Sequence, residues 1–192
     1  SMGHLGLGAL TGFISAFFNT REALPVIAGI ALTATVGAGF TAQLGAMRVS
    51  EEIDALETMS IPSLPYLVTT RVIAGIVAVI PLYCVALFVG YAATRVVTVY
   101  MAGEAGGTFD HYFNVFLVPS DVIWSAAKVL AMAVVVMCVH CYHGYTASGG
   151  PAGVGVAVGR AVRTSLIAIM AIDLLIGIAV YGGTSGAVRV SG

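Results

Sequence analysis

Charge is the property that this sequence lacks most clearly. Only 9% of its 192 residues are Asp, Glu, Lys or Arg, whereas an average soluble domain carries about 25%. So few charged side chains cannot cover a surface that faces water, which excludes soluble globular, coiled-coil and disordered proteins. Because 59% of the residues are hydrophobic, the class that remains is a membrane protein with several spanning segments.

Lysine and cysteine are also scarce. The chain has one lysine and a net charge of −1, so it has no basic patch of the kind that binds nucleic acid. Its cysteines, Cys84, Cys138 and Cys141, lie in apolar runs and are odd in number, so they give no disulfide framework. The sequence shows no basic flank or cleavage site of a signal peptide. Since Ser1 opens the chain, we expect it to begin within a longer protein.

Several apolar runs are long enough to cross a bilayer, which takes about 20 helical residues. These runs are residues 24–47, 72–94, 129–159 and 164–188, the last interrupted only by Asp173. The stretch before the first run is short, and Pro25 predicts a kink because it removes a backbone donor. A Gly-rich cluster that ends at Pro151 interrupts the third run, so we expect that helix to end near Tyr145.

The sequence therefore predicts an all-α polytopic membrane protein with four crossings, built as a single transmembrane domain over residues 1–192. We expect these segments in order: a kinked first helical region at 5–46, a cytoplasmic helix at 48–60, a second span at 66–94, an outer loop with an interfacial helix at 95–124, a third span at 125–145, a cytoplasmic Gly-rich turn at 146–158, and a fourth span at 159–183.

The short loops differ in their content of basic residues. On one side of the membrane fall Arg48, Arg71, Arg160 and Arg163. On the other fall Arg95 and Arg189, with Lys128 at a helix edge and the acids Glu104, Asp110 and Asp121. Cytoplasmic loops carry the excess of basic residues, so we expect the first group to face the cytoplasm of an inner (plasma) membrane protein.

A short cytoplasmic segment holds an unusual share of the charge. Five of the chain's seventeen Asp, Glu, Lys and Arg residues fall within residues 48–59. As a helix, this segment would put Ile53 and Leu56 on one face and Glu51 and Asp54 on another. Two interpretations stay open: a solvated acidic loop, or a helix that docks on a cytoplasmic partner through apolar anchors and charges that set the register.

The same segment belongs to a set of motifs that resembles a known family. Residues 45–59, followed by Tyr-Leu-Val-Thr-Thr-Arg at 66–71, resemble the signature of the MlaE/YrbE permeases, the membrane subunits of ABC-type lipid transporters. Arg-Glu-Ala-Leu-Pro at 21–25 resembles the family's Arg-Glu-Leu-Gly-Pro motif, and residues 149–155 resemble its glycine-rich cytoplasmic turn. The amino-acid sequence of these motifs is most similar to that of YrbE subunits of mycobacterial-type Mce systems.

The resemblance implies a function and a set of partners. The chain would be the permease subunit of an ATP-driven lipid transporter of the Mce/Mla class. It would pair with a second YrbE-type permease subunit as a heterodimer. It would also bind cytoplasmic ABC ATPase subunits, MCE-domain proteins on the outer side, and a lipid substrate. ATP and Mg would be bound by the ATPase, so the chain itself would have no catalytic residues, no cofactor and no metal.

The resemblance also implies which residues couple to the ATPase and which lie by the lipid cavity. The expected ATPase-coupling residues are Ser50, Glu51, Glu52, Ile53, Asp54, Leu56, Glu57 and Met59. Arg21 and Glu22 would lie by the lipid-holding cavity. From the residues themselves we add Asp173, because an acid inside a span costs about 2.5 to 3.5 kcal/mol and normally has a partner. Lys128 on an antiparallel neighbour is a possible partner. A structural ion pair and a cavity lining both stay open for Asp173 and Lys128.

Other patterns indicate no site. Cys138, His140, Cys141 and His143 resemble a metal cluster, but the histidines and cysteines point to different faces of one helix, which cannot close a tetrahedral site. No glycine-rich loop is followed by Gly-Lys-Ser/Thr, so we expect no Walker A loop. Two other functions remain alternatives. One is a secondary transporter or channel, for which only Asp173 is a candidate coupling group. The other is a non-transporting scaffold for an MCE-protein assembly.

Overall fold

The computed structural model describes residues 10–101, 103 and 105–182. Residues 5–9 of the expected first region, Glu104, residue 183 and Arg189 lie outside this part of the chain. The first span is one helix of 40 residues, Leu10–Val49. Along it, α-helical and π-helical segments alternate: η1 (Ser15–Ala23), α2 (Leu24–Leu32), η2 (Thr33–Gly37) and α3 (Ala38–Val49).

The remaining helices follow in simple order. They are α4 (Glu52–Thr58), η3 (Pro65–Thr69), α5 (Thr70–Val96), η4 (Val97–Met101), α6 (Gly106–Phe116), α7 (Pro119–Tyr145) and α8 (Gly150–Tyr181). Four helices are long and apolar enough to cross a membrane: Leu10–Val49, Pro65–Met101, Pro119–Tyr145 and Gly150–Tyr181. Within the described residues, the predicted all-α class with four spans is confirmed.

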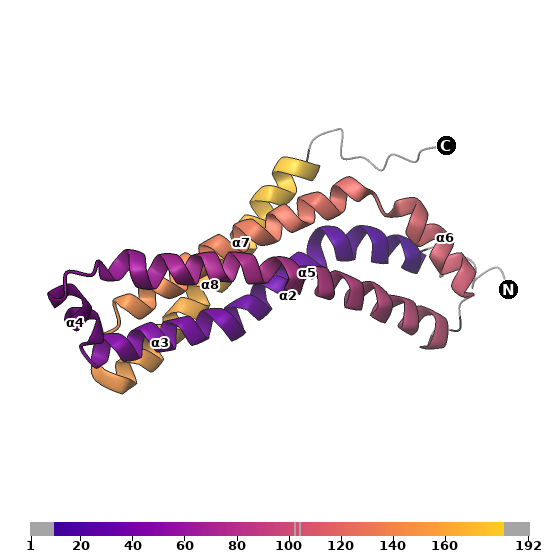
Figure 1. Cartoon of the computed structure of the whole chain (residues 1–192). Coiled ribbons are helices and arrows are strands. Elements are labelled where there is room, and N and C mark those ends of the chain that lie inside the picture. Colours follow the sequence, from indigo (N-terminus) through magenta and orange to yellow (C-terminus); the bar gives the residue numbers. More distant parts are fainter. Residues whose placement is uncertain (1–9, 102, 104, 183–192) are drawn as a thin grey trace.

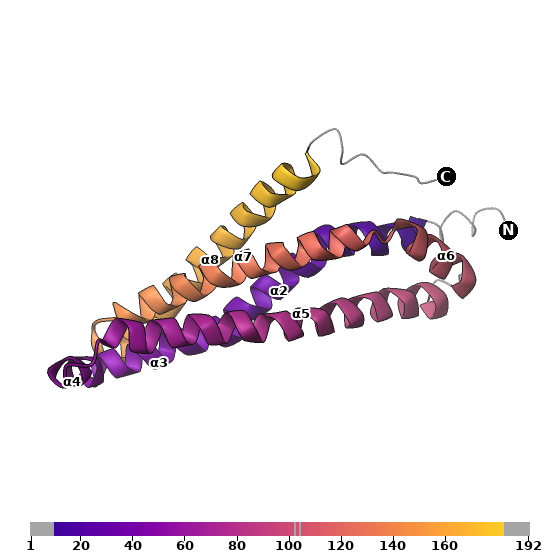
Figure 2. The ribbon, with the colours of Figure 1, turned by 45° about the horizontal axis from the view of Figure 1, so that its top comes forward.

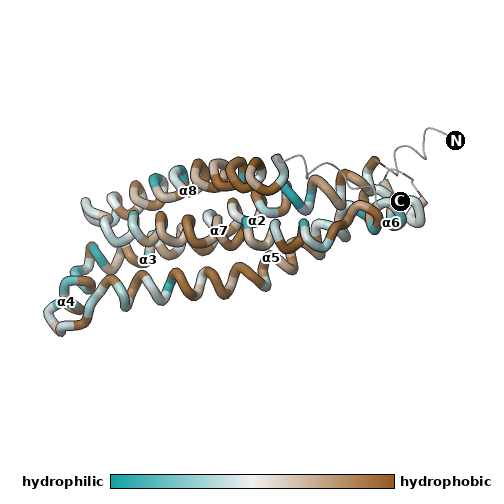
Figure 3. The backbone as a smooth tube through the Cα atoms, turned by 90° about the horizontal axis from the view of Figure 1, so that it is seen from above, coloured by the Kyte–Doolittle hydropathy of each residue, from teal (hydrophilic) through white to brown (hydrophobic). Residues whose placement is uncertain are grey.

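The long helices lie lengthwise beside one another, with α4 at one end of the molecule and α6 at the other (Figure 1). Polar residues gather at α4, whereas hydrophobic residues follow the long helices (Figure 3). Helix α8 starts at the α4 end beside α7 and separates from it toward its own C-terminal end (Figure 2). The two connections that carry α4 and α6 therefore lie at opposite ends of the spans.

Several helix boundaries differ from those expected from the sequence. The second span continues to Met101 and not only to residue 94, and α7 begins at Pro119 and not at residue 125. The segment predicted as one helix at 48–60 is divided, because Glu51 has a left-handed backbone (φ 60°) that ends α3 before α4 begins. Helix α8 begins at Gly150 and not near residue 159. Its start follows from Gly149, whose φ of 88° suits glycine, and from Pro151, which is well placed in a first helical turn.

Helix α7 is at the centre of the packing and contacts α2, α3, α5 and α8. The main core is built from apolar side chains of these elements: Leu24, Ala28, Leu32, Val79, Tyr83, Leu87, Val129, Met132, Ala133, Val136, Met137 and Ile169. A smaller cluster near α4 contains Leu44, Ile53, Leu67 and Cys141. Because α7 contributes to both clusters, it links the two ends of the molecule.

The crossing of α3 and α7 depends on a glycine. A Cβ atom at Gly144 would lie 2.9 Å from Leu44 Cβ and 3.0 Å from the backbone of Thr41. We expect Gly144→Ala to lower the free energy of unfolding by about 1–3 kcal/mol, because a packed crossing cannot absorb an extra methyl group. Gly155→Ala is the matched control, since a Cβ there meets no described atom within 4 Å. Equal thermal unfolding midpoints for the two variants would contradict this account of the crossing.

Candidate functional site

Lys128 is a charged side chain buried inside the helix bundle. Its side chain is only 1% exposed, and its Nζ donates hydrogen bonds to Asp173 Oδ1 at 2.9 Å and to the Arg21 carbonyl oxygen at 2.9 Å. Both carboxylate oxygens of Glu22 lie 3.3 Å from the same Nζ. The structure therefore brings together the four residues predicted as lipid-cavity candidates, Arg21, Glu22, Lys128 and Asp173.

Proline explains why a backbone carbonyl takes part in this network. Pro25 has no N–H, so the carbonyl four residues before it, that of Arg21, loses its ordinary α-helical donor. Lys128 Nζ supplies a donor to that oxygen. Arg21 and Glu22 also lie in the π-helical segment η1, and π-helical turns inside α-helices are frequent at functional sites. The Arg-Glu-x-x-Pro pattern thus places two side chains and the carbonyl that accepts from Lys128 in one segment.

Arg21 extends the network toward the α6 end of the molecule. Its guanidinium forms an ion pair with Asp121, with Nε and an Nη each 2.8 Å from Oδ2, and it lies over the rings of Phe17 and Tyr181. Asp121 falls within the loop expected at 95–124, but in the structure it lies in the first turn of α7 and is only 5% exposed. The sequence does contain a signal for this position. Asp121 precedes Lys128 by seven residues, or about two helical turns, so both side chains lie on the same face of α7.

The network is open on one side. Among its charged groups, the side chain of Lys128 is 1% exposed, that of Asp173 16% and that of Glu22 35%. Glu22 lies close to α8, where a Cβ at Gly177 would be 3.6 Å from its carboxylate. A single ammonium group therefore joins η1, α7 and α8. A shift of α8 relative to the other two must break or rearrange its contacts.

A second candidate site is α4, at the opposite end. Ile53 is fully buried in the cluster with Leu44 and Leu67, which anchors the helix. Glu57 accepts a hydrogen bond from Ser63 at 2.7 Å, and the Ser63 hydroxyl lies 2.9 Å from that of Tyr145 at the end of α7. Helix α4 is therefore held against the ends of three spans.

Most of the predicted coupling residues face outward from this anchored helix. Ser50, Glu51, Glu52, Asp54, Glu57 and Met59 are exposed, and Leu56 is half-buried. Asp54 forms an ion pair with Arg48 at 2.6 Å on the surface. Large apolar side chains beside α4 are exposed as well: Met59, Leu64 and Tyr66 are 61%, 54% and 59% exposed. The surface combines acidic groups with uncovered apolar ones.

The cysteines and histidines at 138–143 of α7 lie partly in the core and partly on the surface. His140 is buried, and its Nδ1 lies 2.7 Å from the Thr41 hydroxyl. Cys141 is buried and Cys138 is exposed, so the two thiols lie in different surroundings. Within residues 10–101, 103 and 105–182, no group of three or more His, Cys, Asp or Glu side chains could hold a metal ion.

Helix α6, at the end of the molecule opposite α4, is tied to the end of α5. Arg95 forms a two-point ion pair with Asp110, with N–O distances of 2.8 and 2.9 Å. The hydrogen bonds from Arg95 hold the pKa of the Asp110 carboxyl below its ordinary value. Both side chains are about half exposed, so this pair fixes the orientation of α6 more than it stabilises the fold.

Comparison with known proteins places these features in a family context. A family described as "Permease MlaE" matches residues 1–179. A "Probable ABC transporter permease protein" of Rickettsia bellii is 36% identical over 157 residues, which are 82% of this chain and 61% of the relative. A protein of the same description from Synechocystis is 32% identical over 94% of this chain and 69% of its own length.

A plant protein is also similar. "Protein TRIGALACTOSYLDIACYLGLYCEROL 1, chloroplastic" of Arabidopsis thaliana is 29% identical over 185 residues, which are 96% of this chain and 53% of the relative. The chain spans 61% of the length of the Rickettsia relative, so it corresponds to part of these proteins.

Proposed function

The chain belongs to the MlaE permease family of multi-pass membrane proteins, and we propose that it is the membrane-spanning subunit of an ATP-driven lipid transporter. In this proposal it has no catalytic site and no cofactor of its own, and a partner ATPase binds ATP and Mg. The observation that carries the proposal is the buried Lys128 network. Charged groups at membrane depth are costly, pair with one another, and mark substrate or ion pathways.

A lipid is the substrate that the surroundings of this network favour. The carboxylates of Glu22 and Asp173 are partly accessible. Asp173 belongs to α8 and Glu22 lies close to it, and the outward side of α8 is apolar and exposed at Leu174 and Ile178. Polar groups next to an apolar surface suit a molecule with a headgroup and acyl chains. The Arabidopsis relative carries the name of a galactolipid, which supports the same substrate class.

The finer assignment is to the Mce class. In amino-acid sequence, the segment at 45–71 and the motif at 21–25 are most similar to YrbE subunits of mycobacterial-type Mce systems. We therefore propose a heterodimer with a second YrbE-type permease in the inner membrane, with ABC ATPase subunits on the α4 side and MCE-domain proteins on the α6 side. The lipid would move through the space between the two permeases near Arg21, Glu22, Lys128 and Asp173.

Helix α4 would transmit the ATPase cycle. Its exposed acidic and apolar side chains would bind the ATPase, and its anchor at Ile53 would pass a displacement to the attached spans. ATP binding on the partner would favour one of two arrangements of the permease pair. Rearrangement of the Lys128 contacts would accompany the change, because Lys128 joins the first span to α7 and α8.

Purification of the permease from its own membrane tests the proposal. We expect an ATPase subunit to co-purify and a lipid to appear in the mass spectrum of the complex. Co-purification with lipid but without any nucleotide-binding subunit would instead favour a scaffold. Transport driven by an ion gradient in the absence of ATP would favour a secondary transporter that uses Glu22, Lys128 and Asp173 as coupling groups.

A further inference from the structure

The α4 end of α8 carries two arginines without ionic partners. Arg160 and Arg163 are exposed, and neither forms an ion pair with any residue that the structure describes. Every other described basic side chain that the sequence places near this end has a partner: Arg48 binds Asp54, and Arg71 donates to the Leu67 carbonyl. The two free guanidinium groups are therefore available for an external anion.

Two adjoining cavities lie beside these arginines, between α7 and α8. One, of about 300 Å³, is lined by His143, Thr146, Ser148 and Arg160, among others. The second, of about 330 Å³, shares His143 and Arg160 and adds Arg163, Thr164 and Ile167. Neither is lined by a described acidic side chain. Together they form a basic surface that is hollowed beside His143 and Arg160 and opens outward at Arg163, hereafter the α7–α8 basic pocket.

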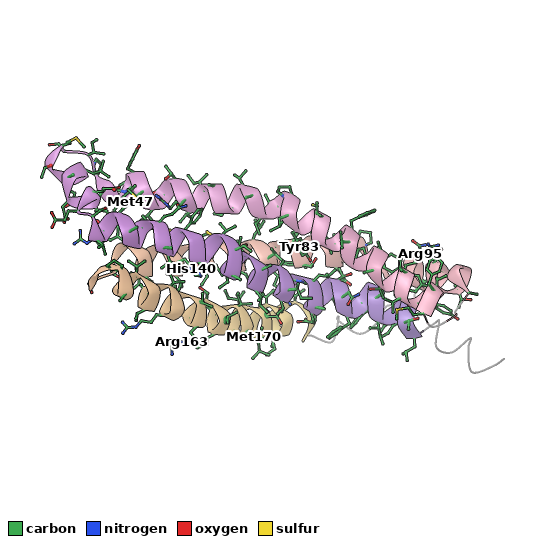
Figure 4. All side chains as sticks on the ribbon, turned by 90° about the horizontal axis from the view of Figure 1, so that it is seen from below. Met47, Tyr83, Arg95, His140, Arg163 and Met170 are labelled. Carbon is green, nitrogen blue, oxygen red and sulfur yellow. The ribbon has the colours of Figure 1, made fainter. Side chains whose placement is uncertain are left out.

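The basic pocket continues into an apolar stripe. Ile167, Met170 and Leu174 follow Arg163 at helical spacing, and they are 72%, 48% and 63% exposed. Arg163 and Met170 lie along the same outer edge of α8, directed away from the other helices (Figure 4). Leu174 is about 16 Å from Arg163 along the helix axis, close to half of the roughly 30 Å hydrocarbon thickness of a bilayer.

We propose that the α7–α8 basic pocket binds the phosphate headgroup of an anionic lipid of the leaflet on the α4 side, with one acyl chain along Ile167, Met170 and Leu174. Guanidinium groups bind phosphate through paired, charge-assisted hydrogen bonds. Basic pockets between spanning helices near the membrane surface hold anionic headgroups. This site is separate from the Lys128 network, and it requires only that the chain spans a membrane, not that it transports lipid.

Lipid titration of the full-length permease, purified with its bound subunits and stripped of lipid, tests the site. We expect dioleoyl phosphatidylglycerol to bind and to raise the thermal unfolding midpoint, and dioleoyl phosphatidylcholine to do neither. Arg160→Gln and Arg163→Gln should each weaken phosphatidylglycerol binding about tenfold, because each removes a charge-assisted contact. Arg95→Gln is the matched control, since it removes the same charge at the opposite end.

Other occupants would give different results. Equal protection by inorganic phosphate would overturn the lipid assignment, because the acyl stripe would then contribute nothing. Loss of a second permease or of the ATPase in Arg160→Gln and Arg163→Gln, with phosphatidylglycerol binding unchanged, would make the surface a protein interface and overturn the proposal. Native mass spectrometry measures both the bound lipids and the subunit composition in one experiment.

Discussion

Replacing Lys128 by methionine is expected to lower the free energy of unfolding by about 3–5 kcal/mol and to stop lipid movement. The substitution keeps the length and apolar stem of the side chain but removes its charge. Asp173 and Glu22 would then face each other without the ammonium group that both contact. Removing one member of a buried ionic set leaves an uncompensated charge, which is the source of the large effect. The thermal unfolding midpoint and lipid transfer by the reconstituted complex measure the two consequences separately.

A neutral version of the network separates structure from function. The triple variant Glu22→Gln/Lys128→Met/Asp173→Asn has no unpaired charge among these three residues, so we expect it to recover most of the lost stability. Lipid transfer should remain absent if the charges act on the substrate or on the change of state. Full recovery of both assembly and transfer in the triple variant would show that the network is only a structural ion pair.

The sequence predicted part of this site for physical reasons that can be named. An acid at membrane depth needs a partner, which pointed from Asp173 to Lys128, and the two side chains do form an ion pair. Pro25 already removes the α-helical donor of the Arg21 carbonyl, but the contact of that carbonyl with Lys128 depends on how the first span packs against α7, which no residue pattern indicates. Asp121 falls in the segment expected as a loop, yet it lies in the first turn of α7 and forms a largely buried ion pair with Arg21.

The helix boundaries also differ in how far they follow from the local sequence. The end of α7 at Tyr145 agrees with the glycine cluster that follows it. The start of α8 differs from the expected residue 159 because Gly149 and Pro151, which commonly interrupt helices, here lead into one: proline is favoured in a first helical turn. The break between α3 and α4 depends on a left-handed Glu51, a conformation that no residue pattern in this segment indicates.

The two candidate sites are joined by the same helices. The first span carries Arg21 and Glu22 near one end and finishes at Val49, directly before α4. Helix α7 carries Lys128, and its last residue, Tyr145, contacts the Ser63 hydroxyl that binds Glu57 of α4. About 25 Å of helix separates Lys128 from Tyr145. A displacement of α4 can therefore reach the charge network through continuous, packed helices without a separate relay.

Reversing the acidic charges at the start of α4 is expected to uncouple this route while leaving the fold intact. The variant Glu51→Lys/Glu52→Lys/Asp54→Lys changes only exposed side chains. The free energy of unfolding should therefore change by no more than about 1 kcal/mol, even with the loss of the surface ion pair between Asp54 and Arg48. Lipid-stimulated ATP hydrolysis by the complex should fall at least about tenfold, because like charges at an interface oppose docking.

Two further variants make the α4 test specific. Leu56→Asp should uncouple the ATPase as well, but it should also lower stability, because Leu56 is half-buried against the Ile53 cluster. Asp110→Lys reverses a charge on α6 at the opposite end and should leave ATP hydrolysis unchanged. Normal co-purification of the ATPase together with normal lipid-stimulated hydrolysis in the charge-reversed and Leu56→Asp proteins would rule out α4 as the coupling element. The partner would then have to act on another surface at that end.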